Sequence, residues 1–155
     1  MLGQELILQQ MPLQNPSDMK YLIIVCLISN VMWSQKLDSH LWNDRVIIIS
    51  ADETNSKLAE SQFNVLQAER DKLKDRKIVI YKCIRDNCVF YNGKEDSKTI
   101  KINAPIKGFE TVLIGLDGRQ KFKSKKLENP SIFFNLIETM PMRRQELKNQ
   151  KKRND

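Results

Sequence analysis

Two apolar strands separated by one helix constrain the fold of this chain more than any other feature. The stretch DRVIIISADETNSKLAESQ, residues 44–62, contains the first strand at 46–49 and the start of a helical pattern that runs over 56–74. A second strand follows in KIVIYKC, residues 77–83. Both strands are apolar on both pleat faces, which is typical of central strands in a sheet. The order strand, helix, strand predicts a right-handed crossover and a parallel pair.

The next part of the chain predicts two hairpins. The first joins short strands at 89–91 and 99–102 through a polar turn. The second joins strands at 111–116 and 119–125 through a tight Asp-Gly turn, which is among the stronger hairpin signals in a single sequence.

A closing helix is predicted after the second hairpin. Asn129 is a good N-cap and Pro130 suits the first helical position. Pro141 ends or kinks this helix. Its buried side is formed by Ile132, Phe133, Leu136, Ile137 and Met140. We therefore expect an α/β domain with a central mixed sheet flanked by helices.

The N-terminal segment has the layout of a secretory signal. Lys20 precedes an apolar run at 21–33, and the small residue Ser34 follows that run. The run is shorter than the roughly 20 residues that span a bilayer, so no stable membrane span is expected. Cleavage near Ser34 would make the protein periplasmic or secreted. The alternative is that the run forms a buried strand or helix of the fold.

These segments suggest a division of the 155-residue chain. Residues 1–18 are an expected upstream extension of the gene model, with Met19 as the true start. Residues 19–34 are the expected signal peptide, residues 35–147 the folded domain, and residues 148–155 a basic tail that frays.

Two cysteines remain after such cleavage, Cys83 and Cys88. A turn through residues 84–87 would bring them face to face across a hairpin mouth. In an exported protein this arrangement allows a structural disulfide, and two unpaired thiols are the alternative. A catalytic pair is less favoured than either, because the spacing is C-x₄-C and not C-x₂-C.

The order of the predicted elements resembles the thioredoxin-like fold. Three stretches together, DRVIIISADETNSKLAESQ, VLIGLDGRQKFKS and IETMPMRRQEL, resemble the domain-of-unknown-function family numbered 4174. The resemblance covers residues 41–147. It implies a thioredoxin-like domain of the kind found in small exported bacterial proteins and at the C-terminus of animal extracellular sushi-repeat and matrix proteins. The family has no assigned reaction.

The resemblance also locates where redox chemistry would be, and the residues for it are missing. A thioredoxin carries its C-x-x-C after the first central strand, where this chain has residues 52–56, Asp-Glu-Thr-Asn-Ser. Those side chains supply no thiolate. A thioredoxin also has a cis-proline directly before the hairpin strand, whereas here Glu110 and Thr111 precede Val112 and the nearest proline is Pro105. We therefore expect no catalytic residues and no cofactor.

A formal net charge of +7 favours acidic partners. Alternating cations on the second hairpin strand could follow a polyanion, or they could protect an edge strand from pairing with another sheet. They are Arg119, Lys121, Lys123 and Lys125.

Arg143 and Arg144 are a second candidate anion site, because guanidinium groups bind sulfate, carboxylate or phosphate in a bidentate manner. The alternative is an internal salt bridge, for example to Glu138 or Glu146, that fixes the C-terminal segment to the domain.

Other kinds of chemistry have little support. His40 is the one histidine and is expected to face solvent in a linker, so no metal site is expected. Nucleic acid is disfavoured by export and by the lack of aromatic residues among the lysines. We expect an exported, non-catalytic binding or adhesion module whose partner is an acidic glycan or another exported protein. The alternative is an atypical thiol-disulfide or peroxide-handling enzyme that uses Cys83 and Cys88.

Overall fold

The computed structural model describes residues 38–93, 98–101 and 106–154. The predicted upstream extension and signal peptide, residues 1–34, lie outside the described residues. A short 3-10 helix, η1 (Asp38–His40), precedes the first strand. None of the described helices is long and apolar enough to cross a bilayer.

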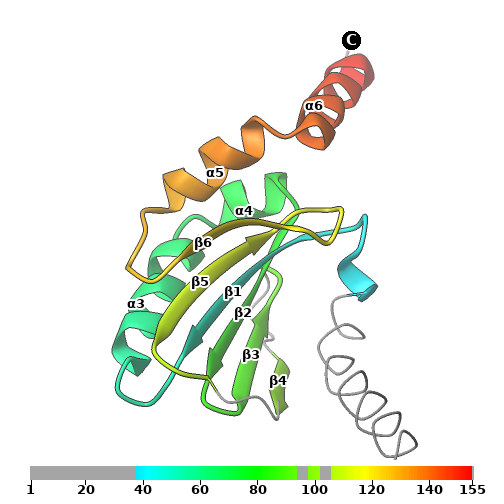
Figure 1. The fold of residues 1–155 in the computed structure, drawn as a ribbon. Coiled ribbons are helices and arrows are strands. Elements are labelled where there is room, and N and C mark those ends of the chain that lie inside the picture. The colour runs from blue at the N-terminus through cyan, green and yellow to red at the C-terminus, as the bar shows by residue number, and fades with distance from the viewer. Residues whose placement is uncertain (1–37, 94–97, 102–105, 155) are drawn as a thin grey trace, which may run out of the picture. The chain divides into compact units, whose positions relative to one another are not determined.

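The described residues form one six-stranded mixed sheet with the order β4-β3-β2-β1-β5-β6 (Figure 1). The two central strands β1 and β2 run parallel, as the strand–helix–strand pattern predicts, and the other neighbours pair antiparallel. The strands are β1 (Arg45–Ala51), β2 (Ile78–Ile84), β3 (Asn87–Tyr91), β4 (Lys98–Lys101), β5 (Phe109–Ile114) and β6 (Gln120–Ser124).

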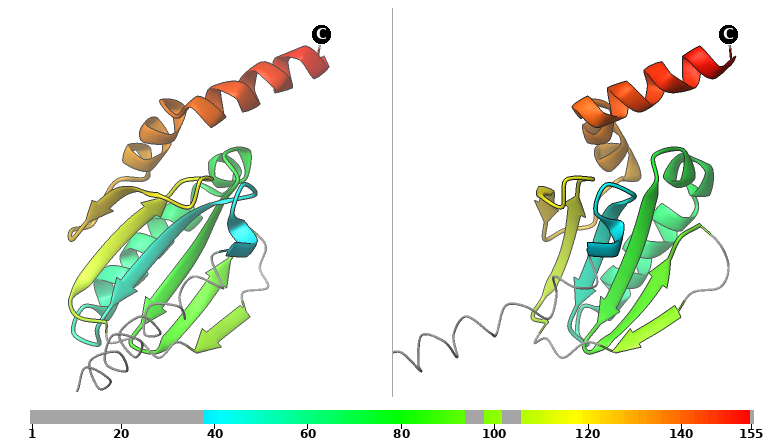
Figure 2. Two further views of the ribbon diagram at one scale, coloured as in Figure 1. Left: turned by 45° about the vertical axis from the view of Figure 1, so that its right-hand side comes forward. Right: turned by 90° about the vertical axis from the view of Figure 1, so that its right-hand side faces the viewer.

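The connecting helices α3 and α4 lie on one face of this sheet (Figure 2). The helices are α3 (Ser56–Gln67), α4 (Arg70–Asp75), α5 (Pro130–Glu138) and α6 (Pro141–Asn154). The main core joins side chains of α3, α4 and α5 to the sheet, and its fully buried members include Ile47, Leu66, Ile80, Leu113 and Phe133. The α/β, thioredoxin-like arrangement with a central mixed sheet flanked by helices is therefore confirmed.

The opposite face of the sheet is less fully covered. Ile48, Tyr81, Phe90 and Val112 are half-buried there. The η1 segment covers one end of this face, where the ring of His40 contacts the rings of Tyr81 and Phe90. The sequence pattern correctly identifies central strands, but the two faces differ in how completely they are buried.

Two helices differ from the sequence-based expectation. The helix predicted over 56–74 is divided into α3 and α4. The α-helical hydrogen bonding ends after Leu66 with a 3-10-type bond, in which Glu69 N–H donates to the Leu66 carbonyl at 3.0 Å. Residues 148–154 continue α6, so the fraying expected for this tail is not observed over them. They are mainly Lys, Gln and Arg, which are good helix formers.

Candidate functional site

The turn after β1, where a thioredoxin carries its reactive cysteines, is occupied by a hydrogen-bonded carboxylate. Asp52 Oδ1 accepts hydrogen bonds from the backbone N–H of Asn55 at 3.0 Å and from its side-chain Nδ2 at 2.8 Å. Asp52 Oδ2 accepts a third from the backbone N–H of Gly108 at 2.7 Å, and Asp52 N–H donates to the Gly108 carbonyl at 3.0 Å. Asp52 thus ties the β1–α3 turn to the loop that precedes β5.

These hydrogen bonds decide the ionisation of Asp52. The side chain of Asn55, followed by the backbone N–H groups of Gly108 and Asn55, lowers the pKa of the Asp52 carboxyl below its ordinary value. A carboxylate held in this form is a poor general acid at neutral pH. The ionised Asp52 carboxylate therefore joins the two loops through its hydrogen bonds.

The loop before β5 presents glycine backbone to this turn. Gly108 has a φ of +71°, a left-handed conformation that glycine adopts without a steric penalty. No cis peptide bond occurs in the described ranges. Gly108 thus directly precedes β5, the position at which the resemblance to thioredoxins would place a cis-proline.

The two candidate cysteines form a disulfide on the neighbouring strands. Cys83 and Cys88 are directly opposite each other in β2 and β3, with their Cα atoms 3.9 Å apart and their sulfur atoms bonded. Their residues are only 1% and 2% exposed. Of the two alternatives left open by the sequence, the structure has the disulfide.

The turn that joins these strands reaches back toward the end of β1. Arg85 has a φ of +55° and its N–H donates to the Ala51 carbonyl at 3.0 Å. Its guanidinium lies 3.5 Å from the Glu53 carboxylate, with both side chains largely exposed. The end of the sheet is therefore held by backbone hydrogen bonds and a weak surface ion pair.

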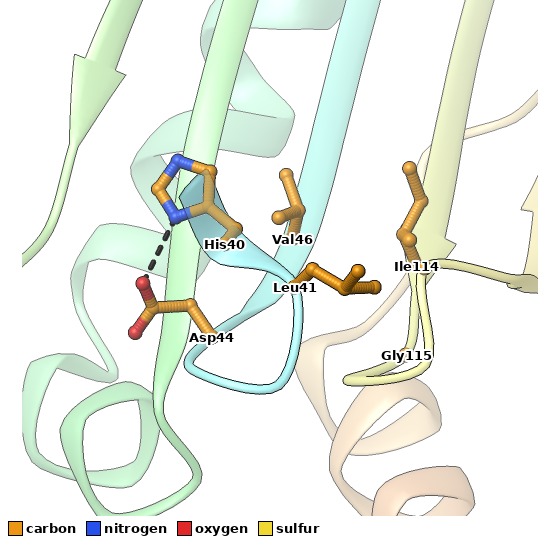
Figure 3. Close-up of a pocket in the computed structure, with 7 residues that line it drawn as sticks. His40, Leu41, Asp44, Val46, Ile114 and Gly115 are labelled. Atoms are coloured by element: carbon orange, nitrogen blue, oxygen red, sulfur yellow. Dashed lines mark hydrogen bonds and ion pairs between the residues drawn. The ribbon is translucent and has the colours of Figure 1, made fainter. Parts of the chain in front are cut away.

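His40 is the polar residue that the sequence reading placed wrongly. It is buried, with 9% exposure, and it lies between Asp44 and Tyr81. Its Nδ1 is 2.9 Å from Asp44 Oδ2 (Figure 3), and its Nε2 is 2.8 Å from the Tyr81 hydroxyl. A histidine four residues before an aspartate is the signal that could have indicated the first of these contacts.

The Asp44 carboxylate, the His40 imidazole and the Tyr81 phenol form a short polar chain beside a small pocket. Burial, and secondly the negative charge of Asp44, raises the pKa of the Tyr81 hydroxyl above its ordinary value. The pocket has a volume of about 10 Å³, the room for one water molecule. It is too small for an organic substrate. Its lining residues are His40, Leu41, Asp44, Val46, Ile114, Gly115 and Gly118 (Figure 3).

Metal ligands do not gather in the part of the chain that the structure describes. No group of three or more His, Cys, Asp or Glu side chains is placed there to hold an ion.

The lysines of β6 are mostly neutralised by neighbouring carboxylates. Lys121 Nζ lies 2.7 Å from Asp117 Oδ2, and Lys123 Nζ lies 2.8 Å from Glu110 Oε2. Lys125 is exposed beyond the end of the strand. β6 is an edge strand of the described sheet, which suits charged side chains that discourage pairing with another sheet. As an anion site, this face has little free charge.

Arg143 is buried among acidic groups, as the internal salt-bridge interpretation expects. It is 2% exposed, its Nε donates to Glu138 at 3.3 Å, and its Nη1 donates to the Asp75 carbonyl at 2.9 Å. Nη2 donates to the Asp75 carboxylate. Burial by itself would lower the pKa of Arg143, but the hydrogen bonds to Asp75 and Glu138 outweigh it and raise the pKa. Arg143 is therefore closed to an external anion, whereas Arg144 is exposed.

A second buried arginine, Arg45, belongs to this network. The sequence gives no signal for its burial except that it directly precedes an apolar run. Arg45 is 0% exposed, and its Nη1 donates to the Arg76 carbonyl at 2.7 Å and to Glu146 at 3.2 Å. Arg143 and Arg45 together attach α6 to α4 and β1. The motif Met-Pro-Met-Arg-Arg-Gln-Glu, residues 140–146, thus has a structural role.

Comparison with known proteins supplies a family and no activity. A family model described as "Domain of unknown function (DUF4174)" matches residues 36–146. The match begins just before η1 and ends at Glu146, the residue that pairs with Arg45. No curated protein and no solved structure matches the chain.

Proposed function

This chain belongs to the family described as "Domain of unknown function (DUF4174)", and we propose that it serves as an exported binding or adhesion module without catalytic chemistry. The observation that carries the proposal is the burial of the Cys83–Cys88 disulfide, with 1% and 2% exposure. A redox-active cysteine needs an accessible sulfur and a stabilised thiolate, and neither sulfur is accessible.

The site at the end of β1 supports the same proposal. The turn there is closed by the Asp52 hydrogen bonds to Asn55 and Gly108. At the opposite end of β1, His40 and Asp44 of the polar chain line a pocket that holds only one water molecule. A substrate would find neither an open cleft nor a free nucleophile at these places.

Export is supported by the disulfide and by the signal-like segment. Structural disulfides persist in oxidising compartments and are rare in the reducing cytosol. The apolar run at 21–33 with Lys20 before it and Ser34 after it fits a secretory signal. We propose a periplasmic or secreted location on these two grounds.

The partner is proposed to be acidic, either a glycan or another exported protein. The formal net charge of the chain is +7, which attracts polyanions and speeds their association at low salt.

Turnover assays test the absence of catalysis. Wild type and Cys83→Ser are compared for reduction of insulin in the presence of dithiothreitol and for consumption of hydrogen peroxide. We expect both proteins to match the buffer blank. A rate above the blank that disappears in Cys83→Ser would establish the thiol enzyme instead.

A further inference from the structure

We propose that the outward face of α6 is the surface that binds an acidic glycan. This face is formed by Arg144, Lys148, Lys151 and Lys152, which we call the α6 basic stripe. The inference rests on the proposed function, because it assigns a place and a chemical class to the partner of the module.

The geometry of the helix directs these four side chains away from the domain. Arg143 and Glu146 face inward and pair with Asp75 and Arg45. At about 100° per residue, the four stripe residues fall within an arc of roughly 100° on the side opposite to those two. From Arg144 to Lys152 the stripe is about 12 Å long. In Figure 1, α6 lies beyond α5 at one end of the domain.

The stripe is a concentration of cations that no carboxylate among the described residues compensates. All four residues are exposed, and none of them forms an ion pair with a residue that the structure describes. The one acidic residue in α6, Glu146, lies 3.2 Å from Arg45 and 3.7 Å from Arg143. By contrast, Lys121 and Lys123 on β6 each have a carboxylate within 2.8 Å.

Helix stability explains only part of this arrangement. Cations in the last turn, such as Lys151 and Lys152, interact favourably with the helix dipole. Arg144 lies in the first turn, where a positive charge is unfavourable and where α6 has no acidic residue to offset it. No apolar side chain follows Leu147, so burial does not explain why α6 continues to Asn154. Binding of an anion would compensate the charge of both ends of the stripe.

A glycan fits this surface better than a membrane does. A membrane-surface helix needs a continuous apolar face opposite its cations. The exposed apolar residues of α6 are Met142 and Leu147, which lie roughly 140° apart around the axis. A row of cations without an apolar face suits a hydrated, extended polyanion.

The family match places most of the stripe outside the shared domain. The match ends at residue 146, so Lys148, Lys151 and Lys152 follow the matched segment. We therefore expect glycan binding through α6 to be a property of this chain and not of every member of the family.

Binding to heparin, used as a sulfated-glycan probe, tests the proposal. Two variants remove four cations each: R144Q/K148Q/K151Q/K152Q on α6, and the matched control R119Q/K121Q/K123Q/K125Q on β6. Affinity is measured at 50 and 200 mM salt, with circular dichroism to verify the fold. We expect the α6 variant to lose affinity by at least about tenfold and to show a shallower salt dependence, because fewer counterions are released. The β6 variant is expected to change by less than about threefold, since Lys121 and Lys123 are ion-paired and only Arg119 and Lys125 contribute free charge.

Four results would overturn the assignment. Equal losses of heparin affinity in the two variants would mean that net charge alone determines binding. A larger loss in the β6 variant would show that the glycan binds at β6. Absence of heparin binding by the wild type at 50 mM salt, or tighter binding to vesicles containing phosphatidylserine, would exclude the glycan. The turnover assays are independent of all four results, so the non-catalytic proposal can fail or survive separately.

Discussion

The Arg45 side chain, at the start of β1, lies 3.2 Å from the Glu146 carboxylate in α6, although the two residues are 101 positions apart in the sequence. The contact joins the first strand of the domain to its last helix. Arg45 is fully buried, and its Nε and Nη2 have no hydrogen-bond partner among the described residues. Glu146 is therefore the main compensation for a positive charge inside the protein.

We expect Glu146→Ala to destabilise the domain by about 3 kcal/mol, because it leaves the buried Arg45 guanidinium without a counter-charge. Arg45→Met is expected to cost less than about 1.5 kcal/mol. It removes two unpaired donors, and Glu146 keeps Arg143 at 3.7 Å and Lys77 at 3.9 Å. Urea unfolding followed by circular dichroism measures both.

Glu69→Ala is the matched control, since the Glu69–Lys72 ion pair lies on the surface. It is expected to change stability by less than about 1 kcal/mol. Equal costs for Glu146→Ala and Glu69→Ala would show that Glu146 does not compensate a buried charge.

The disulfide is expected to stabilise the fold moderately. It closes a loop with a sequence separation of 5, and for so short a loop the chain-entropy relation gives about 2 kcal/mol. Cys83→Ala/Cys88→Ala should therefore fold but unfold at lower urea concentration. A variant as stable as the wild type would contradict a stabilising role for the disulfide.

The Asp52 hydrogen bonds predict a stability difference that depends on pH. The pKa of Asp52 is lowered in the folded state by Asn55 and Gly108, so its contribution is fully present above the unfolded value of 3.8. That contribution disappears as pH falls through the folded-state pKa. Asp52→Asn should lower the thermal midpoint at pH 7, and the difference from wild type should shrink below about pH 4. A difference that stays constant from pH 7 to pH 3 would show that the ionised Asp52 carboxylate does not stabilise the fold.

Tyr81 predicts an effect at the alkaline end. Burial, and then the charge of Asp44, raises the pKa of Tyr81 above the ordinary 10.0. The neutral phenol thus contributes stability below pH 10, and this contribution is lost as pH rises through the raised pKa. Absorbance at 295 nm should show a late-titrating phenol that is absent in Tyr81→Phe. Unchanged titration in that variant would mean that Tyr81 is not protected.

Much of the fold could be predicted because its signals are local. Two doubly apolar strands around one helix predict the parallel pair of β1 and β2, and the Asp-Gly turn predicts the β5–β6 hairpin. The Asn129 cap is also local, since its side chain accepts a hydrogen bond from the Ser131 N–H at 2.9 Å.

The candidate site was harder to predict because its contacts are distant in sequence. His40 and Tyr81 are 41 positions apart, and Asp52 reaches Gly108 across 56 positions. No local period encodes such pairs. The burial of Arg45 is also hidden, because a charged residue before an apolar run is normally read as solvated.

The reduction potential of Cys83–Cys88 tests the central claim, a thioredoxin-like scaffold without thiol chemistry, most directly. The folded protein is equilibrated in redox buffers, and the free thiols are trapped by alkylation and counted by mass spectrometry. We predict that the disulfide stays oxidised down to about −300 mV, as is typical of structural disulfides in secreted proteins. Reversible reduction between about −120 and −270 mV, the range of catalytic oxidoreductases, with the fold retained, would contradict it.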